Sequence, residues 1–294
     1  MQTGNVVTQV FLPLSLAVIM FSLGLALVVD DFKRVVRQPK DFFVGAAVQM
    51  VLLPAIAAAL VWVWPMEPAL AVGLMILAAC PGGATSNLMT HLARGDTALS
   101  VTLTAVISVL NVITLPLIVG AAIVLLMDAE TAPEISVGET IVGLFLITIV
   151  PVAAGMALRA AWPGFALRLE PTARTIATIL FVLIIGGAVA SEWKNLGNYF
   201  AQAGPVTLLL NVVMMVLAYY VARLFRLGTP QRTAVVLEGG LQNGTLAIFV
   251  AVTLLGNTTM MVPGGIYSLL MFVTAGAFMF VAHRQAARMT PRAA

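Results

Sequence analysis

Charged residues are scarce in this chain. They make up 9% of its 294 residues, and 61% of the residues are apolar, whereas soluble domains typically carry about 25% charged residues. This composition excludes a soluble globular domain and predicts an all-α polytopic membrane protein lying in a lipid bilayer. The sequence pI is about 9.4, but no basic patch is interleaved with aromatic residues, so we expect no nucleic-acid partner.

Cysteine and histidine are also nearly absent. The single cysteine, Cys80, excludes an internal disulfide, and the only histidines are His91 and His283. No cluster of soft ligands is therefore available for a transition metal, and we expect no organic cofactor. Residues 1–9 contain no basic residue ahead of the first long apolar run, so we expect no cleaved signal peptide.

Nine apolar segments have a length close to the roughly 20 residues that a membrane-spanning helix requires. Short polar breaks separate them, and no linker or soluble domain interrupts the series, so we expect one transmembrane unit over residues 1–294. The nine expected spans cover approximately residues 9–29, 41–63, 69–93, 97–126, 137–159, 172–191, 204–225, 231–255 and 263–284.

The basic residues support this count. With nine spans, consecutive loops alternate between the two sides of the membrane, and Lys and Arg accumulate on the cytoplasmic side. Fourteen of the 15 basic residues fall on one side, which predicts an N-terminus outside and a C-terminus inside a cell inner (plasma) membrane. The other side holds Lys194 and most of the loop acids, namely Glu67, Asp128, Glu130, Glu134, Glu139 and Glu192.

Glu238 is the only carboxylate inside a membrane-length apolar segment. A charged side chain at that depth costs roughly 2.5–3.5 kcal/mol on insertion scales, so it requires a cation, a proton or a partner. The residues after it, Gly239-Gly240-Leu241-Gln242-Asn243, predict a break in the helix. Non-helical backbone is tolerated at this depth only where it is packed in protein or lines a cavity. Glu238 therefore marks a candidate functional site.

The third span carries a similar interruption, Cys80-Pro81-Gly82-Gly83-Ala84-Thr85-Ser86-Asn87. Paired interrupted spans at corresponding positions in two halves of a chain indicate the binding site of a transporter built from inverted repeats. Gln49 and Asn211 are the lone amides of the second and seventh spans, which adds a weak match between the halves. Two five-helix repeats without the first helix would give nine spans.

Polar residues of the fourth span could contribute to the same site. Gly95 is expected to end the third span and Asp96 to cap the fourth. Ser100, Thr104 and Ser108 follow at four-residue spacing and therefore share one helix face. Hydroxyls at this spacing either face the break of the third span or bond back to their own helix, and the spacing alone favours neither.

The two interrupted motifs resemble those of the bile acid:sodium symporter family. The segment from Cys80 to Asp96 is similar to one family motif, and Glu238-Gly239-Gly240-Leu241-Gln242-Asn243 with Val262-Pro263-Gly264 downstream is similar to another. The resemblance covers nearly the whole chain and identifies it as a bacterial homologue of the apical sodium-dependent bile acid transporter. Bacterial members have ten helices, and this chain is expected to lack the first.

The resemblance implies a panel domain, about 9–63 and 137–191, that rocks against a core of about 69–126 and 204–284, with part of 41–63 packed at the sodium sites. It also implies two bound sodium ions. The first site would use Ser86, Asn87, Ser100, Thr104 and Glu238. The second would use Gln49, Glu238, Gln242 and the backbone carbonyls of Gly239 and Leu241.

We therefore expect a monomeric symporter, not an enzyme, that imports an organic anion with Na⁺ by alternating access. The anion is expected near the N-termini of two half-helices, at Ala84, Thr85, Asn243 and Gly244. Ala84-Thr85 departs from the Thr-Ala of other members, so the identity of the anion stays open. Proton coupling through Glu238 is an alternative. An intramembrane enzyme or a ligand sensor is disfavoured, because the sequence offers no paired acid, no Ser/Lys dyad and no output domain.

Overall fold

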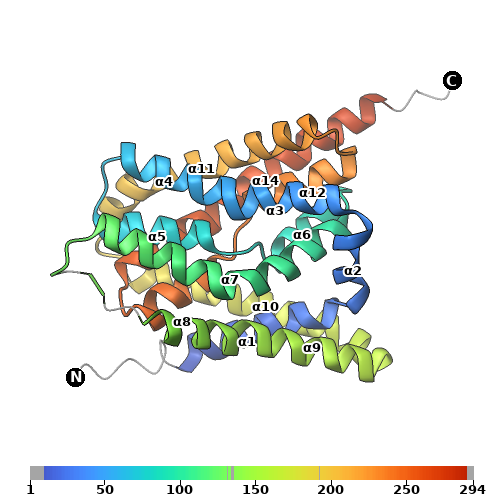
Figure 1. Ribbon diagram of the computed structural model, residues 1–294, viewed down its shortest axis with the longest axis horizontal. Helices are drawn as coiled ribbons and strands as arrows, with labels where there is room; N and C mark the ends of the chain where they lie inside the picture. The colour runs from blue at the N-terminus through green and yellow to red at the C-terminus, as the bar shows by residue number, and fades with distance from the viewer. Residues whose placement is uncertain (1–9, 131, 134–135, 192, 290–294) are drawn as a thin grey trace.

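The computed structural model describes residues 10–130, 132–133, 136–191 and 193–289, and these residues form helices joined by short loops (Figure 1). The α-helices are α1 (Leu12–Ala26), α2 (Val29–Arg37), α3 (Pro39–Ala47), α4 (Leu53–Val63), α5 (Pro68–Ala79), α6 (Ala84–Leu92), α7 (Thr97–Leu126), α8 (Val137–Leu144), α9 (Val150–Ala161), α10 (Pro163–Ser191), α11 (Leu196–Leu224), α12 (Thr229–Gly240), α13 (Gly244–Phe249) and α14 (Val262–Met289). Single π turns continue three of these helices, η2 (Val48–Leu52), η3 (Phe145–Ile149) and η4 (Val250–Leu254), and a 3₁₀ turn, η5 (Thr259–Met261), precedes α14.

The helices confirm the all-α, polytopic fold class and the expectation of about nine spans. Within the described residues, seven helices are long and apolar enough to cross a membrane, and the number rises to nine if each of two bent helix pairs counts as one span. The bent pairs are α1 with α2, at 67°, and α5 with α6, at 61°. Of the residues used to sort charge, Glu134, Glu192 and Arg292 lie outside the described residues.

Helix α2 was not predicted from the sequence, in which residues 30–40 read as a polar connection. It crosses one end of the bundle at a steep angle to the other helices (Figure 1). Phe32 and Val35 on this helix pack against the apolar interior, whereas Lys33 is exposed and forms an ion pair with Asp30. The helix has nine residues, too few to cross a membrane without α1, and it contains five charged residues.

Helix α10 also begins earlier than expected, at Pro163 rather than near residue 172. Its first turns carry charged residues that hydropathy assigns to a loop. Glu170 and Arg174 form an ion pair one helical turn apart, a spacing that supports an exposed helix. The hydropathy of the sequence therefore predicted the apolar part of this helix and missed the polar turns at its start.

Both interrupted spans are broken where the sequence predicted. The third span stops at Ala79 and resumes at Ala84, and the eighth stops at Gly240 and resumes at Gly244. The two breaks meet, since the backbone N–H of Asn243 donates to the carbonyl of Pro81 over 2.9 Å. In α12 every residue from Thr233 to Gly240 is buried. Unwound backbone at this depth is thus covered by protein on all sides, as the absence of water there requires.

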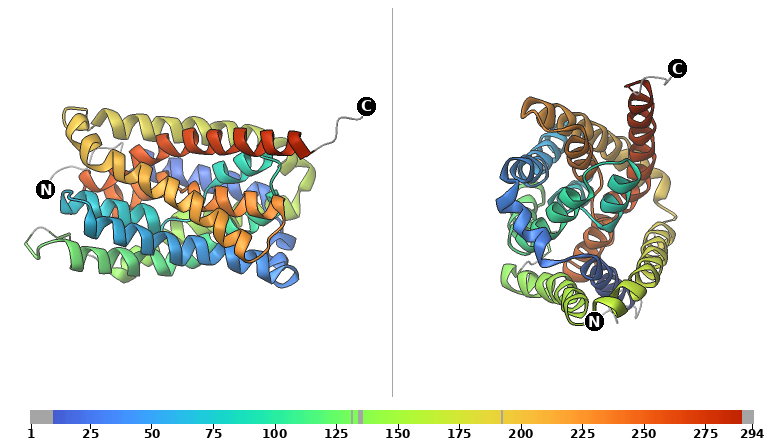
Figure 2. Two further views of the ribbon diagram at one scale, coloured as in Figure 1. Left: turned by 90° about the horizontal axis from the view of Figure 1, so that it is seen from above. Right: turned by 90° about the vertical axis from the view of Figure 1, so that its right-hand side faces the viewer.

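The helices form two packing groups, which are visible end-on in the right panel of Figure 2. Helix α1 packs against α9 and α10. The second group contains both broken spans, with α12 packed against α6, α7 and α11, and α5 packed against α4, α7 and α14. The span formed by α3, η2 and α4 packs against α5, α7, α11 and α12. This span was expected to belong to the panel with part of it packed at the sodium sites, and its contacts in the structure are with helices of the second group.

A π turn in this span places Gln49. Residues Val48–Leu52 form the turn, directly ahead of Pro54 in the first turn of α4. Proline lacks the N–H that a continuous α-helix would use there and its ring crowds the carbonyl four residues earlier. Widening one turn accommodates that clash and rotates the residues before it, as π turns at functional sites commonly do. Gln49 is 2% exposed as a result of its position on the buried face.

Two glycines permit the close crossing of α1 and α9. A Cβ added at Gly155 would collide with the backbone of Phe21 and Gly24, and one added at Gly24 would collide with the backbone of Val152. Small residues at such crossings let membrane helices approach closely without side chains between them. The first packing group depends on this contact, because α1 is its central helix.

We predict that Gly155→Val lowers the apparent melting temperature of the detergent-solubilised protein, with a destabilisation of about 1–3 kcal/mol, as overpacking typically causes. Gly186→Val in α10 is the matched control, because no atom lies within 4 Å of a Cβ at Gly186. Thermal unfolding of the two variants tests the prediction. Equal melting temperatures would mean that the α1–α9 crossing is not a tight contact.

Candidate functional site

Glu238 lies in the last turn of α12, where it is 1% exposed. Its carboxylate oxygen Oε1 accepts hydrogen bonds from Ser86 Oγ of α6 at 2.6 Å and from Ser100 Oγ of α7 at 2.5 Å. Thr104 Oγ1, one turn further along α7, lies 3.1 and 3.2 Å from the two carboxylate oxygens. The structure thus brings together three helices around a single buried carboxylate.

Asn87 joins this group. Its Oδ1 lies 2.8 Å from Ser100 Oγ and 3.3 Å from Thr104 Oγ1. All five residues expected at the first sodium site therefore lie in one cluster. We call it the carboxylate cluster, and it consists of Ser86, Asn87, Ser100, Thr104 and Glu238.

The carboxylate cluster holds more acceptor oxygens than protons. Its three hydroxyls can donate one proton each. The oxygens within reach of them are Asn87 Oδ1, both oxygens of Glu238 and the carbonyl of Gly83, which lies 2.7 Å from Ser86 Oγ. Each hydroxyl approaches at least two of these acceptors, and it can satisfy only one. Each hydroxyl oxygen thus lies close to at least one acceptor oxygen with no proton between the two atoms. Such a pair of oxygens repels unless a cation or an additional proton lies between them.

Gly82 is required for this approach. A Cβ at Gly82 would collide with the Glu238 carboxylate and crowd Ser86 Oγ. At Gly83, by contrast, the nearest atom to an added Cβ is Thr85 Oγ1 at 3.5 Å, an ordinary contact. The first glycine of the Gly-Gly pair therefore admits the carboxylate, and the second is not needed sterically.

The residues expected at the second sodium site also lie together, more loosely. Gln242 Nε2 is 3.2 Å from the carbonyl of Glu238 and 3.3 Å from that of Gly239. Gln49 Nε2 is 3.5 Å from the Glu238 carbonyl and from Gln242 Oε1, the upper limit for a hydrogen bond. Gln49 Oε1 is buried without a hydrogen-bond partner. We call Gln49, Gln242 and these two carbonyls the amide cluster. Leu241 adjoins it as the first extended residue after α12.

The four residues expected to contact substrate differ in accessibility. Ala84 and Thr85, at the start of α6, are partly exposed, whereas Asn243 and Gly244 are buried. Asn243 Oδ1 accepts from the Leu246 N–H and from Thr245 Oγ1, so it caps α13. A Cβ at Gly244 would collide with Ser268 Oγ, which means that Gly244 is held against α14. Of these four residues, Ala84 and Thr85 are therefore the two with exposed surface that a ligand could contact.

Ser108 and Asn111 of α7 do not join the carboxylate cluster. Ser108 Oγ donates back to the Thr104 carbonyl at 2.6 Å, which is the local bond that the sequence left open for all three hydroxyls. Asn111 Nδ2 donates to the Ala79 carbonyl at the end of α5. Both residues line a small cavity between the two packing groups, together with Met20, Pro81, Val112, Leu115, Leu144, Thr148 and Leu246.

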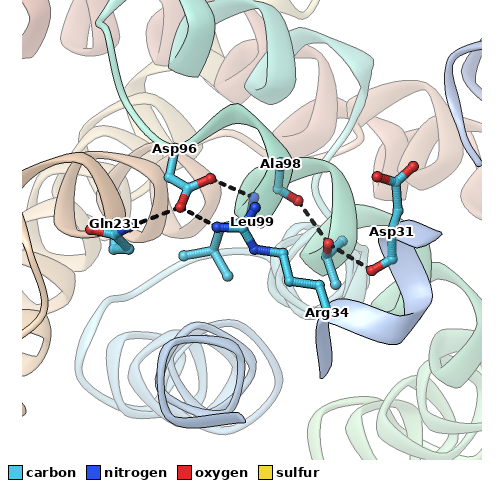
Figure 3. Close-up of polar contacts among 7 residues, drawn as sticks. Asp31, Arg34, Asp96, Ala98, Leu99 and Gln231 are labelled. Atoms are coloured by element: carbon cyan, nitrogen blue, oxygen red, sulfur yellow. Dashed lines mark hydrogen bonds and ion pairs between the residues drawn. The ribbon is translucent and has the colours of Figure 1, made fainter. Parts of the chain in front are cut away.

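A second polar cluster lies where α7 and α12 begin (Figure 3). Asp96 caps α7 by accepting from the Leu99 N–H at 3.0 Å, as expected. Its carboxylate also forms an ion pair with Arg34 of α2 and accepts from Gln231 of α12 at 2.9 Å. The Asp96 N–H donates to the carbonyl of Pro230 at 2.8 Å. This cluster ties together the starts of the two helices that carry Ser100 and Glu238.

The sequence did not reveal the partners of Asp96, because Arg34 is 62 residues away and Gln231 is 135. Gly95 lies shortly after the end of α6, in keeping with its expected place at the end of the third span. The residue with positive φ after α6 is Arg94, at 56°, and Gly95 has no positive φ. Gly95 instead allows a close approach, since a Cβ there would crowd Thr90 and Thr233 of α12.

Comparison with known proteins places the chain among sodium-dependent transporters. The sequence profile of the Sodium Bile acid symporter family matches residues 13–199. The chain is 29% identical to the uncharacterized sodium-dependent transporter YocS of Bacillus subtilis over 82% of this chain and 73% of that one. It is 30% identical to the ileal sodium/bile acid cotransporter of Mus musculus, over 82% and 69%, and 26% identical to the probable chloroplastic sodium/metabolite cotransporter BASS1 of Arabidopsis thaliana, over 96% and 70%.

We predict that Asp96→Ala destabilises the protein more than Lys33→Ala does. The first change removes a helix cap, which is typically worth about 1 kcal/mol, and leaves the partly buried Arg34 without its ion pair. The second removes only an exposed pair within α2, which contributes little because water and salt screen it. Thermal unfolding in detergent measures both. Equal losses would show that the polar cluster at Asp96 does not hold α2, α7 and α12 together.

Proposed function

This chain belongs to the sodium/bile acid symporter family, and we propose that it imports an organic anion together with Na⁺ by alternating access. Membership makes it a multi-pass membrane transporter that depends on sodium. We further propose that the sodium ions bind at the carboxylate cluster and the amide cluster.

The shortage of protons in the carboxylate cluster is the observation that carries this proposal. Na⁺ prefers hard oxygen donors, and in this cluster the hydroxyl oxygens of Ser100 and Thr104 each lie within about 3.3 Å of both the Glu238 carboxylate and the amide oxygen of Asn87. With a cation among them, each hydroxyl could direct a lone pair toward the cation and donate its proton to one neighbouring acceptor. The cation would also offset the cost of burying Glu238, whose carboxylate is bonded to Ser86, Ser100 and Thr104 and to no basic side chain of the described residues.

The amide cluster supports a second ion. Gln49 Oε1 is an acceptor with no partner at a buried position, and such a group is costly unless something binds it. The 3.2–3.5 Å separations leave the carbonyls of Glu238 and Gly239 poorly satisfied by Gln242 and Gln49. Ends of half-helices with exposed carbonyls coordinate Na⁺ in other transporters. One carboxylate and two Na⁺ leave the site about one unit positive.

That net charge favours a monovalent organic anion as the substrate. The partly exposed Ala84 and Thr85 lie at the N-terminus of α6, where the helix dipole attracts negative charge. We propose that a carboxylate or sulfonate binds here, beside the crossing with Asn243 and Gly244. Leu88 and Leu92 further along α6 are 40% and 51% exposed, so an apolar body attached to the anion would meet apolar side chains.

The two packing groups suggest how access alternates. We propose that α1, α8, α9 and α10 form the panel and that the remaining helices, including α3–α4, form the core. The open face of α6 belongs to the end of the bundle that carries Arg34, Arg94 and Arg226, which we assign to the cytoplasm. The substrate site is thus approached from the cytoplasmic side in this conformation, and the small cavity beside Ser108 marks the opposite side of the crossing. We propose that one chain suffices for transport in the plasma membrane.

Proton coupling is the second candidate, and the same observation favours it. A proton on Glu238 would supply one more donor to the carboxylate cluster and would remove its buried charge. It would leave the amide cluster unexplained, because protonating Glu238 provides no partner for Gln49 Oε1.

We predict that Glu238→Gln abolishes Na⁺-stimulated uptake in proteoliposomes while the protein still inserts and folds. The amide preserves the shape of the side chain but removes the charge that balances the cation. Uptake of radiolabelled organic anions in Na⁺ against K⁺ measures the effect. Substrate accumulation by the Gln variant under a Na⁺ gradient would contradict the proposal, and uptake driven by a pH gradient without Na⁺ would favour proton coupling.

We predict that Ser100→Ala and Thr104→Ala each raise the Na⁺ concentration for half-maximal stabilisation by about tenfold. Hydrogen bonds or ligand contacts to charged groups contribute about 1.5–3 kcal/mol, and about 1.4 kcal/mol corresponds to a factor of ten. Ser108→Ala on the same helix face is the matched control and should leave the Na⁺ response unchanged. Thermal-shift titration with NaCl at constant ionic strength tests all three. Three variants that melt lower with identical Na⁺ responses would mean that these hydroxyls only pack helices.

A further inference from the structure

We propose that Asn211 and Tyr267 are positioning residues for the amide cluster, because they hold the last carbonyl of α12 and so reserve the preceding carbonyls for the cation. The inference rests on the proposed function and extends it to two residues that touch neither Na⁺ nor substrate.

The last three carbonyls of α12, those of Glu238, Gly239 and Gly240, differ in how closely their hydrogen-bond donors approach. A helix C-terminus leaves up to four carbonyls without an intrahelical partner, and here only the Leu237 carbonyl retains one, the Leu241 N–H at 2.8 Å. The carbonyls of Glu238 and Gly239 meet Gln242 and Gln49 at 3.2–3.5 Å. The Gly240 carbonyl instead accepts from Asn211 Nδ2 at 2.6 Å and from Tyr267 Oη at 2.9 Å.

The short bonds at Gly240 and the long bonds before it divide the helix end into two parts. A carbonyl oxygen has two lone pairs, and two good donors occupy both of them at Gly240. This carbonyl has no remaining capacity for a cation. The Glu238 and Gly239 carbonyls keep theirs, since their amide donors are weakly bound and can be displaced. The two hydrogen bonds that Asn211 and Tyr267 donate to the Gly240 carbonyl therefore determine which backbone oxygens are available to Na⁺.

Both donors come from rigid, buried surroundings. Asn211 and Tyr267 are each 0% exposed and belong to the long helices α11 and α14. A Cβ at Gly240 would crowd the side chain of Met215, so α11 lies directly against the end of α12. Gly240 thus cannot rotate its carbonyl away without separating these helices.

The Asn211 side chain also carries a cost that packing alone does not explain. Its Oδ1 is buried without a hydrogen-bond partner, and an unsatisfied amide oxygen at such a depth destabilises the fold. An apolar residue of similar size would avoid that cost but would not donate to Gly240. The end of α5 has a related arrangement, in which Asn111 Nδ2 donates to the Ala79 carbonyl at 2.9 Å. A terminal carbonyl held by an amide from a long neighbouring helix therefore occurs at both breaks.

The experiment is a thermal-shift titration with NaCl, at ionic strength held constant with choline chloride, on the purified full-length chain. Tyr267→Phe removes one donor with little change of shape, and Asn211→Leu removes the other. We expect each variant to raise the half-saturating Na⁺ concentration about two- to tenfold, the range that one hydrogen bond typically contributes. Tyr199→Phe is the matched control, because its hydroxyl lies 3.4 Å from Thr259 Oγ1, away from the break. It should bind Na⁺ as the unchanged protein does.

A double-variant cycle separates positioning from general packing. In the Gln49→Ala background the amide cluster is already impaired, so Tyr267→Phe should then change the Na⁺ response by less than twofold. An equal shift in both backgrounds would overturn the proposal. So would an unchanged Na⁺ response of Tyr267→Phe accompanied by a lower melting temperature.

The same titration distinguishes this inference from the proposed function. If the unchanged protein shows no Na⁺-specific stabilisation, the sodium sites and the positioning role fail together. If it responds to Na⁺ and both Tyr267→Phe and Asn211→Leu respond identically to it, only the positioning role fails. Should Asn211→Leu not fold, Tyr267→Phe alone decides the outcome.

Discussion

One constraint governs how the helices are arranged: the Glu238 carboxylate is buried inside a membrane-spanning protein, and no basic side chain of the described residues pairs with it. Glu238 can be accommodated only if oxygen and hydroxyl groups are assembled around it, because neither water nor lipid can solvate it at that depth. Ser86, Ser100 and Thr104 provide hydroxyl donors, and they come from two other helices. The positions of α6, α7 and α12 relative to one another are thus tied to this residue.

The breaks in the third and eighth spans follow from the same constraint. A continuous α12 would keep the carbonyls of Glu238 and Gly239 in its own hydrogen bonds, whereas ending the helix at Gly240 releases them toward Gln242 and Gln49. Unwinding at Cys80–Gly83 brings Ser86 to the carboxylate, and Gly82 leaves the room for it. The released backbone is then satisfied by specific donors: Asn243 binds Pro81, Asn111 binds Ala79, and Asn211 and Tyr267 bind Gly240. These donors satisfy the carbonyls of Pro81, Ala79 and Gly240, whereas the carbonyls of Glu238 and Gly239 have only long contacts, at 3.2–3.5 Å, to the two glutamines.

Some features could not be read from the chain because they depend on partners far away in sequence. Asp96 was recognisable as a helix cap, since capping is a local interaction, but its ion pair with Arg34 and its bond to Gln231 were not. Helix α2 escaped prediction because its apolar face is short and its charged residues read as a loop. The position of Gly95 illustrates the same limit. Its place at the end of the third span could be read from the sequence, but its close contact with Thr233 of α12 could not, because Thr233 is far away along the chain.

The amino-acid sequence was enough to assign the membrane class, the approximate spans and the two breaks, because hydropathy, glycine and proline act locally. The residues around Glu238 were implied by the resemblance of two long motifs to a known family. The packing of the helices was needed to show which hydroxyl reaches the carboxylate: Ser100, Thr104 and Ser108 share one helix face, yet Ser108 bonds back to its own helix. The same packing determines that the Gly240 carbonyl accepts two short hydrogen bonds, whereas the carbonyls of Glu238 and Gly239 have only long contacts. The reason is that a side chain's reach depends on how neighbouring helices cross, and crossing geometry arises from the packing of the whole bundle rather than from any one segment.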